Sequence, residues 1–90
     1  MKRIQRKRTK GFKLPQNTKC VNRPLKFGNP FSVAEHGRTE ALKLYREWLD
    51  DKLNSKELDI NELRQYDYLA CFCSLDEPCH ADILIEKLNQ

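Results

Sequence analysis

The sequence predicts a small single α/β domain: a sheet of two or three strands, expected to be parallel, two to three helices, and a flexible basic N-terminal arm. Two observations lead to this fold. Short apolar or β-branched segments alternate along the chain with amphipathic helical segments, an order typical of α/β units. The chain has 90 residues, which is enough for one domain with a modest core. We expect residues 1–10 to form the arm and residues 11–90 the domain.

The first third of the chain is expected to contain one strand. Residues 1–10 have a single aliphatic side chain after the initiator Met, Ile4, and this composition is typical of a flexible segment. Residues 18–22 are short and partly β-branched, which predicts the first strand. Residues 26–31 (Lys-Phe-Gly-Asn-Pro-Phe) have the composition of a loop, because Gly permits positive φ angles and the residue before Pro is pushed toward an extended conformation.

Two helical segments are expected in the middle of the chain. Thr39 is suited to cap a helix that runs to about Leu53, because apolar residues recur on one face at positions 41, 44, 45 and 48. Residues 59–62 (Asp-Ile-Asn-Glu) have the spacing of a capping box, which predicts a second short helix reaching about Gln65.

The last third predicts a strand, a loop and a helix. Residues 68–73 (Tyr-Leu-Ala-Cys-Phe-Cys) are apolar without a break, as in the central strand of a sheet buried on both faces. A polar loop follows, and the final helix carries Ala81, Leu84, Ile85 and Leu88 on one face. A strand, helix and strand in this order favour a parallel pair joined by a right-handed crossover.

Charge is distributed unevenly. Residues 1–34 hold ten Lys or Arg and no acid, whereas residues 35–90 hold seven Lys or Arg and thirteen Asp or Glu. Such asymmetry is typical of a basic arm that contacts nucleic acid or another phosphate-bearing partner. The alternative is that the arm packs on the acidic half of its own domain.

Three thiols and an imidazole fall within ten residues: Cys71, Cys73, Cys79 and His80. Thiol and imidazole bind transition metals, so one reading is an ion such as zinc held by the three cysteines, with His80 or Cys20 as fourth ligand. A second reading is a reactive thiol at Cys79 with His80 as its base, and these two are the candidate catalytic residues. A third is that the cysteines are small apolar core residues and His80 is a polar cap.

A ligand site is expected where the parallel strands end. Carboxyl ends of parallel strands and helix N-termini are common sites for anions. Residues of the first loop, Arg23, Lys26, Gly28 and Asn29, are therefore candidates to hold a phosphate or a base near Cys79 and His80. The sequence contains no Walker-type or dinucleotide glycine motif and no serine-hydrolase pattern. With no signal peptide and no membrane-spanning stretch, we expect a cytoplasmic protein with no membrane partner and reduced thiols.

Three motifs in a fixed order also resemble a known family. They are Gly28-Asn29-Pro30-Phe31, the segment around residues 41–49, and Cys71-Phe72-Cys73 followed by Cys79-His80. Their order resembles the uncharacterised bacterial and phage family numbered 4326 among the domains of unknown function, over about residues 8–88. The resemblance implies a compact α/β domain and carries no reaction. In a phage member, a host protein is a further expected partner.

Two functions therefore remain open. The first is a binding module with a Cys/His site, expected to hold zinc, and a basic arm for nucleic acid or another polyanion. The second is an enzyme that acts on a nucleotide or a similar small phosphate compound through the Cys/His cluster at the strand ends. The oligomeric state is not predicted.

Overall fold

The computed structural model of the chain describes residues 1–23 and 25–89. It confirms the α/β fold class, with three strands and three α-helices. In chain order the elements are β1 (Lys2–Gln5), β2 (Thr18–Cys20), α1 (Val33–His36), α2 (Arg38–Asn54), the 3-10 helix η1 (Ile60–Leu63), β3 (Tyr68–Cys71) and α3 (His80–Leu88).

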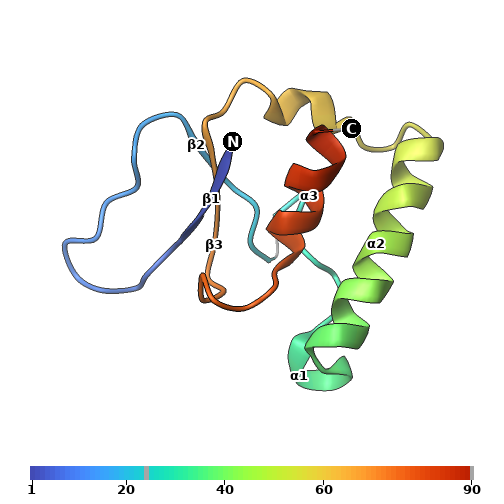
Figure 1. Cartoon of the computed structure of the whole chain (residues 1–90), viewed down its shortest axis with the longest axis horizontal. Coiled ribbons are helices and arrows are strands. Elements are labelled where there is room, and N and C mark those ends of the chain that lie inside the picture. The colour runs from blue at the N-terminus through green and yellow to red at the C-terminus, as the bar shows by residue number, and fades with distance from the viewer. Residues whose placement is uncertain (24, 90) are drawn as a thin grey trace.

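The sheet, whose strands are labelled in Figure 1, is parallel throughout and has the order β1-β3-β2, so the last strand in the sequence lies in the middle. The register pairs Lys2 and Thr18 with Tyr68 on either side. Because β3 is central, Leu69, Ala70 and Cys71 are buried. The three carboxyl ends meet at one edge of the sheet, where the segments after each strand come together.

The sequence did not predict β1. Residues 2–5, assigned above to a flexible arm, pair in register with β3, and Arg6 extends the pairing by donating its backbone N–H to the carbonyl of Cys71 at 2.7 Å. The segment reads Lys-Arg-Ile-Gln, and charged side chains of this kind are common on edge strands, where they discourage pairing with other chains. The strand exists because β3 offers a free edge 66 residues away in register. The division of the chain at residue 10 stays a prediction.

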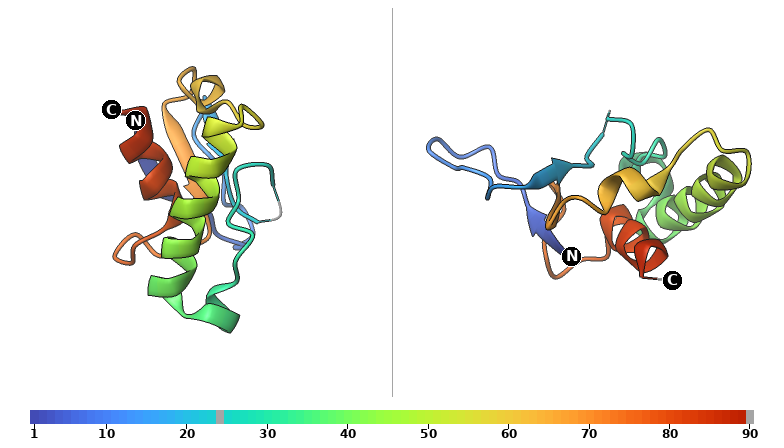
Figure 2. Two further views of the ribbon diagram at one scale, coloured as in Figure 1. Left: turned by 90° about the vertical axis from the view of Figure 1, so that its right-hand side faces the viewer. Right: turned by 90° about the horizontal axis from the view of Figure 1, so that it is seen from above.

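The helices lie in two successive layers on one face of the sheet (Figure 2). Helix α3 packs against β1 and β3, and α2 packs against α3. Apolar side chains from every layer fill the space between them, each adding roughly 1.5–3 kcal/mol by burial. The largest fully buried ones are Tyr45, Phe27, Leu49, Leu63, Leu69, Leu84 and Val21.

The helices follow the predicted pattern with three differences. The second predicted helix is the 3-10 helix η1, which ends at Leu63 and not at about Gln65. Helix α2 begins at Arg38, one residue before the predicted cap Thr39, and Gly37 caps it with a φ of 77°. Helix α1 was not predicted, although Ser32 and Glu35 have the spacing of a capping box and the Ser32 hydroxyl accepts the N–H of Ala34. Among the described residues, no helix is long and apolar enough to cross a membrane.

Candidate metal centre and adjoining pocket

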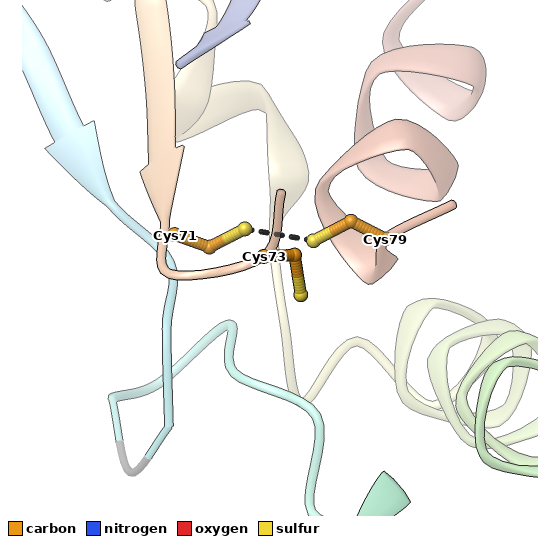
Figure 3. Close-up of side chains that lie close together, drawn as sticks. All are labelled: Cys71, Cys73 and Cys79. Carbon is orange, nitrogen blue, oxygen red and sulfur yellow. Dashed lines mark hydrogen bonds between the residues drawn. The ribbon is translucent and has the colours of Figure 1, made fainter. Parts of the chain in front are cut away.

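Three cysteines from two elements and the loop between them form one cluster. Cys71 ends β3, Cys73 lies in the loop, and Cys79 precedes α3. The three sulfurs lie within 4.8 Å of one another, and those of Cys71 and Cys79 point toward each other at 2.7 Å (Figure 3). Three thiols at this separation are a group that can hold a metal ion.

The start of α3 explains how Cys79 reaches this cluster. Its backbone is extended, with φ −141° and ψ 154°, so Cys79 caps the helix from outside the first turn. The Asp82 carboxylate accepts the N–H of Cys79 at 3.0 Å and fixes this cap. The strand end and the helix start therefore bring residues eight positions apart into contact.

Arg3 approaches the cluster from β1. Its side chain is 7% exposed, its Nη2 donates to the carbonyls of Leu75 and Glu77 at 3.0 and 2.9 Å, and its Nε lies 3.2 Å from the carboxylate of Asp82. Burial is the largest single influence and lowers the pKa of the Arg3 guanidinium, but the Asp82 carboxylate and the nearby sulfurs together raise this pKa by more. These sulfurs are those of Cys79 and Cys71, so a cation faces the thiols.

Arg38 approaches the cluster from α2. Its Nη1 lies 3.7 Å from the sulfur of Cys73 and donates to the carbonyl of Pro78 at 2.8 Å, while its Nε lies 3.0 Å from the Glu77 carboxylate. The Cys73 sulfur raises the pKa of Arg38. Two guanidinium groups therefore flank the three sulfurs, and positive charge of this kind favours thiolates over thiols.

The three thiols of the cluster influence one another's ionisation, and the lowered pKa falls on Cys73. The Cys73 sulfur accepts hydrogen bonds from the thiol of Cys71, the thiol of Cys79 and the guanidinium of Arg38, in decreasing order of effect. These hydrogen bonds lower the pKa of the Cys73 thiol far below its ordinary value. Sharing its proton with Cys73 raises the pKa of Cys71. Hydrogen bonding with Cys71 and Cys73 raises the pKa of Cys79. The cluster thus combines a lowered pKa at Cys73 with raised pKa values at Cys71 and Cys79, and a bound cation would favour the thiolate form of all three.

His80 lies beside the cluster. Its Nε2 is 2.5 Å from the carbonyl of Val21 and acts as the donor, which leaves Nδ1 as an acceptor 3.6 Å from the sulfur of Cys79. The ring also packs edge-on against Tyr45, with centroids 5.2 Å apart. Burial lowers the pKa of His80, so the neutral imidazole is favoured.

Within the described residues, the group of potential metal ligands contains the three cysteines alone. The nitrogens of His80 do not join this group. Cys20, the last residue of β2, does not join it either, and pairs with Ala70 of β3. Side chains alternate along a strand, so Cys20 and Ala70 lie on the opposite face of the sheet from Cys71. His80 as a fourth ligand stays a prediction.

The cluster fits a thiophilic ion after a small adjustment. Zinc–sulfur bonds are about 2.3 Å long, which sets two thiolates on one tetrahedral ion about 3.8 Å apart. The sulfurs of Cys71 and Cys79 would therefore separate by about 1 Å, a shift that rotation of either side chain provides. The guanidinium of Arg3 also fits, because its Nη1 is buried without a hydrogen-bond partner among the described residues, and the guanidinium as a whole interacts with the sulfurs of Cys79 and Cys71, which metal binding would make anionic.

An open pocket of about 250 Å³ adjoins the cluster at the carboxyl edge of the sheet. Cys71 and Cys73 belong both to the cluster and to the wall of this pocket. Three arginines contribute positive charge, and there is no acidic side chain among the lining residues, which are Arg8, Asn22, Arg23, Asn29, Phe31, Val33, Arg38, Leu42, Cys71, Phe72, Cys73 and His80. Such a wall suits a small anion with an apolar or planar part.

Phe72 anchors the segment after β1 to this pocket. The guanidinium carbons of Arg6 and Arg8 lie 4.8 and 4.6 Å from the centre of its ring. Arg6 also donates to the side-chain oxygen of Asn22 at 2.9 Å. The arginines of the predicted arm therefore make contacts within the domain, and Arg8 is placed at the pocket.

The structure brings together two of the four predicted ligand residues. Arg23 and Asn29 line the pocket, whereas Lys26 does not and pairs with Glu62 at 3.0 Å. The amide of Asn29 is engaged in the loop itself, since it donates to Ala41 and accepts from the N–H of Phe31.

Gly28 has a packing role. A Cβ there would lie 2.7 Å from the carbonyl oxygen of Asn22 and 2.9 Å from the backbone of Arg23. The glycine therefore allows two backbone segments at the pocket to approach closely. Ligand binding by the four predicted residues stays a prediction.

Sequence reasoning missed Arg3, Arg8, Arg38 and Phe72 as parts of the site. Arg3 and Arg8 lie in the segment read as a flexible arm, and Arg38 stands just before the predicted helix cap Thr39. No local spacing connects any of them to the cysteines. The available signal was the position of Arg8 and Phe72 just beyond two strands that proved to be neighbours in a parallel sheet.

Comparisons with known proteins place the chain in a family without an assigned activity. A family model described as "Domain of unknown function (DUF4326)" matches residues 4–90. No curated protein and no solved structure matches the chain. The family match confirms the resemblance described above, while a bacterial or phage origin stays a prediction.

Proposed function

The chain belongs to the DUF4326 family, whose description assigns no activity, and we propose from the geometry of the site that it is an α/β binding module whose fold is stabilised by a bound zinc ion. Its pocket takes a small phosphate-bearing ligand of mononucleotide size. The observation that supports this function is that Cys71 and Cys73 belong both to the metal-binding cluster and to the pocket wall. This proposal combines the metal of the first predicted function with the ligand of the second.

Size and charge narrow the ligand class. Small-molecule sites usually have volumes of about 300–1,000 Å³, so a pocket of about 250 Å³ is suited to one mononucleotide or less and is too small for a dinucleotide cofactor. Arg8, Arg23 and Arg38 favour an anion, and planar guanidinium groups match phosphate oxygens in pairs. Phe31 and Phe72 provide aromatic surface for a base.

Zinc suits the cluster for a second reason. A domain of this size buries only a limited apolar core, and a structural ion contributes its binding free energy to folding. Three thiolates on a divalent ion leave a net negative charge, which Arg3 and Arg38 are placed to balance.

Two measurements test the proposal. Elemental analysis and native mass spectrometry of protein purified under reducing conditions should find one zinc ion per chain. Titration calorimetry should then show binding of adenosine monophosphate, with adenosine at least about tenfold weaker because it lacks the phosphate that the arginines recognise. Absence of both the ion and the binding would remove the proposed function.

Two neighbouring cations in one loop provide a matched pair of variants. Arg23→Gln removes a charge that lines the pocket, and we expect it to weaken adenosine monophosphate binding about tenfold. Lys26→Gln removes the same charge from an exposed pair with Glu62 outside the pocket, and its affinity should stay at the wild-type value. Equal losses in both variants would indicate unspecific attraction by the basic surface rather than a pocket site.

Nucleic acid is a second candidate partner, supported by the connection between β1 and β2. This segment projects away from the helices (Figure 1) and carries Lys7, Lys10 and Lys13 around Phe12, which is 39% exposed. An aromatic ring among cations is suited to single strands. Fluorescence anisotropy with a labelled oligonucleotide should show affinity that falls steeply between about 50 and 200 mM salt and is lost when the three lysines are replaced by Gln. Undiminished binding by this variant would contradict the candidate.

A further inference from the structure

We propose that the ion held by Cys71, Cys73 and Cys79 keeps its fourth coordination position open toward the arginine-lined pocket, where a phosphate oxygen of the bound ligand completes it. This inference rests on the proposed function and makes the ion part of the ligand site. A zinc ion that serves folding alone almost always has four protein ligands, whereas an ion with three protein ligands and one open position can stabilise the fold and also bind an exogenous group.

The number of protein ligands is the first argument. Among the described residues, three sulfurs form the group and no histidine, aspartate or glutamate joins them. The ring of His80 lies beside the group, with Nδ1 3.6 Å from the sulfur of Cys79, and is fixed there by the hydrogen bond from Nε2 to the carbonyl of Val21 and by the edge-on packing with Tyr45. Moving the ring into the group would weaken these contacts in a buried environment.

The direction of the open position is the second argument. On its buried side the cluster meets the guanidinium of Arg3, which has only N–H donors and cannot coordinate a metal. On the other side, Cys71 and Cys73 line the pocket, which is open to solvent. A fourth ligand therefore reaches the ion from the pocket.

The charge beside the cluster is the third argument, and it decides which part of the ligand lies at the ion. Arg38 lines the pocket and also places its Nη1 3.7 Å from the sulfur of Cys73. An anionic oxygen at the ion would thus contact a guanidinium at the same time, whereas an uncharged base would leave Arg38 without this partner. The phosphate is expected at the ion, and the base is expected at Phe31 and Phe72.

Cobalt(II) in the full-length chain tests the proposal, because its visible d–d bands report the ligands of a tetrahedral site. Inorganic phosphate and adenosine monophosphate should each shift these bands, and adenosine should not. In Arg38→Gln, the phosphate concentration for half of the shift should rise about tenfold. Arg46→Gln, which removes a cation in an exposed pair with Glu86, should leave this concentration unchanged.

Each other outcome is also decisive. If calorimetry shows that adenosine monophosphate binds while the cobalt bands stay unchanged, the open position is overturned and the pocket of the proposed function survives. If no cobalt or zinc binds, both the metal part of the proposed function and this inference fail.

The role of His80 is decided in two ways. Bands that change in His80→Gln before phosphate is added would make the imidazole the fourth ligand and overturn the inference. Should this buried variant fail to fold, X-ray absorption of the zinc-loaded wild-type protein replaces it. Outer-shell scattering from an imidazole ring would overturn the inference, and three sulfurs with one light ligand and no such scattering would support it.

Discussion

Replacing Arg3 by Met tests whether the N-terminal strand belongs to the metal centre. The side chain is 7% exposed and connects β1 to the loop before α3 through the carbonyls of Leu75 and Glu77. Hydrogen bonds to a charged group contribute about 1.5–3 kcal/mol each when their partners are buried. Here both carbonyls lie on an exposed loop and are hydrated after the substitution, so we expect a total loss of about 2 kcal/mol in the free energy of unfolding.

Two quantities should change in this variant. For a domain of this size, about 2 kcal/mol corresponds to a fall in melting temperature of about 8–16 °C, measurable by circular dichroism. Zinc affinity, measured by competition with a chromophoric chelator, should fall about 10- to 100-fold, because groups that contact the ligands of a metal typically have effects of this size. Arg46→Met is the control, since it removes a cation from an exposed surface pair worth at most about 1 kcal/mol.

The two measurements separate two roles of Arg3. If the variant is less stable but binds zinc with wild-type affinity, Arg3 only connects β1 to the loop. The proposed role of its guanidinium in balancing the charge of Cys71 and Cys79 is then refuted.

Three further predictions follow from single residues. In the zinc-loaded protein, Cys79→Ser should lower the free energy of unfolding by several kcal/mol, whereas Cys20→Ser, outside the cluster, should melt within a few degrees of wild type; equal melting of both would exclude a structural ion. Gly28→Ala should destabilise the chain by about 1–3 kcal/mol in urea unfolding, because its Cβ meets the backbone of Asn22, and an unchanged midpoint would contradict this packing. Burial raises the pKa of Tyr45, so its neutral form stabilises the fold below the unfolded pKa of about 10 and this stability is lost as pH rises above it. Above pH 10 the unfolding free energy should fall by about 1.4 kcal/mol per pH unit more steeply than in Tyr45→Phe, and parallel slopes would count against it.

The sequence was informative where structure depends on neighbours in the chain. The apolar run at residues 68–73 predicted the central strand, and the periodicity after Thr39 predicted α2 to within two residues at its start and about one at its end. Cys71, Cys73 and Cys79 were recognised as a group because they lie in one strand–loop–helix unit, whose strand end and helix start converge.

Features that depend on distant pairing were not predictable in this way. Strand β1 has the composition of a solvated segment, and it is a strand because β3 lies beside it. The contacts of Arg3 with the loop before α3 join residues more than 70 positions apart, so no local spacing signals them. Arg23 and Lys26 look equivalent in the sequence, and only the path of their loop places one in the pocket and the other beside Glu62.

The position of β3 between β1 and β2 has a consequence for how the chain folds as it is synthesised. Within the described residues, no strand pairs with another until Tyr68–Cys71 is available, and each pairing then closes a loop of about 50 to 66 residues. The entropy of closing such loops must be offset before the sheet gains any stability, which is typical of slow-folding topologies. A nascent chain that lacks β3 therefore has no sheet, and all three thiols of the cluster lie at or beyond the end of β3, so they are synthesised only after every earlier element.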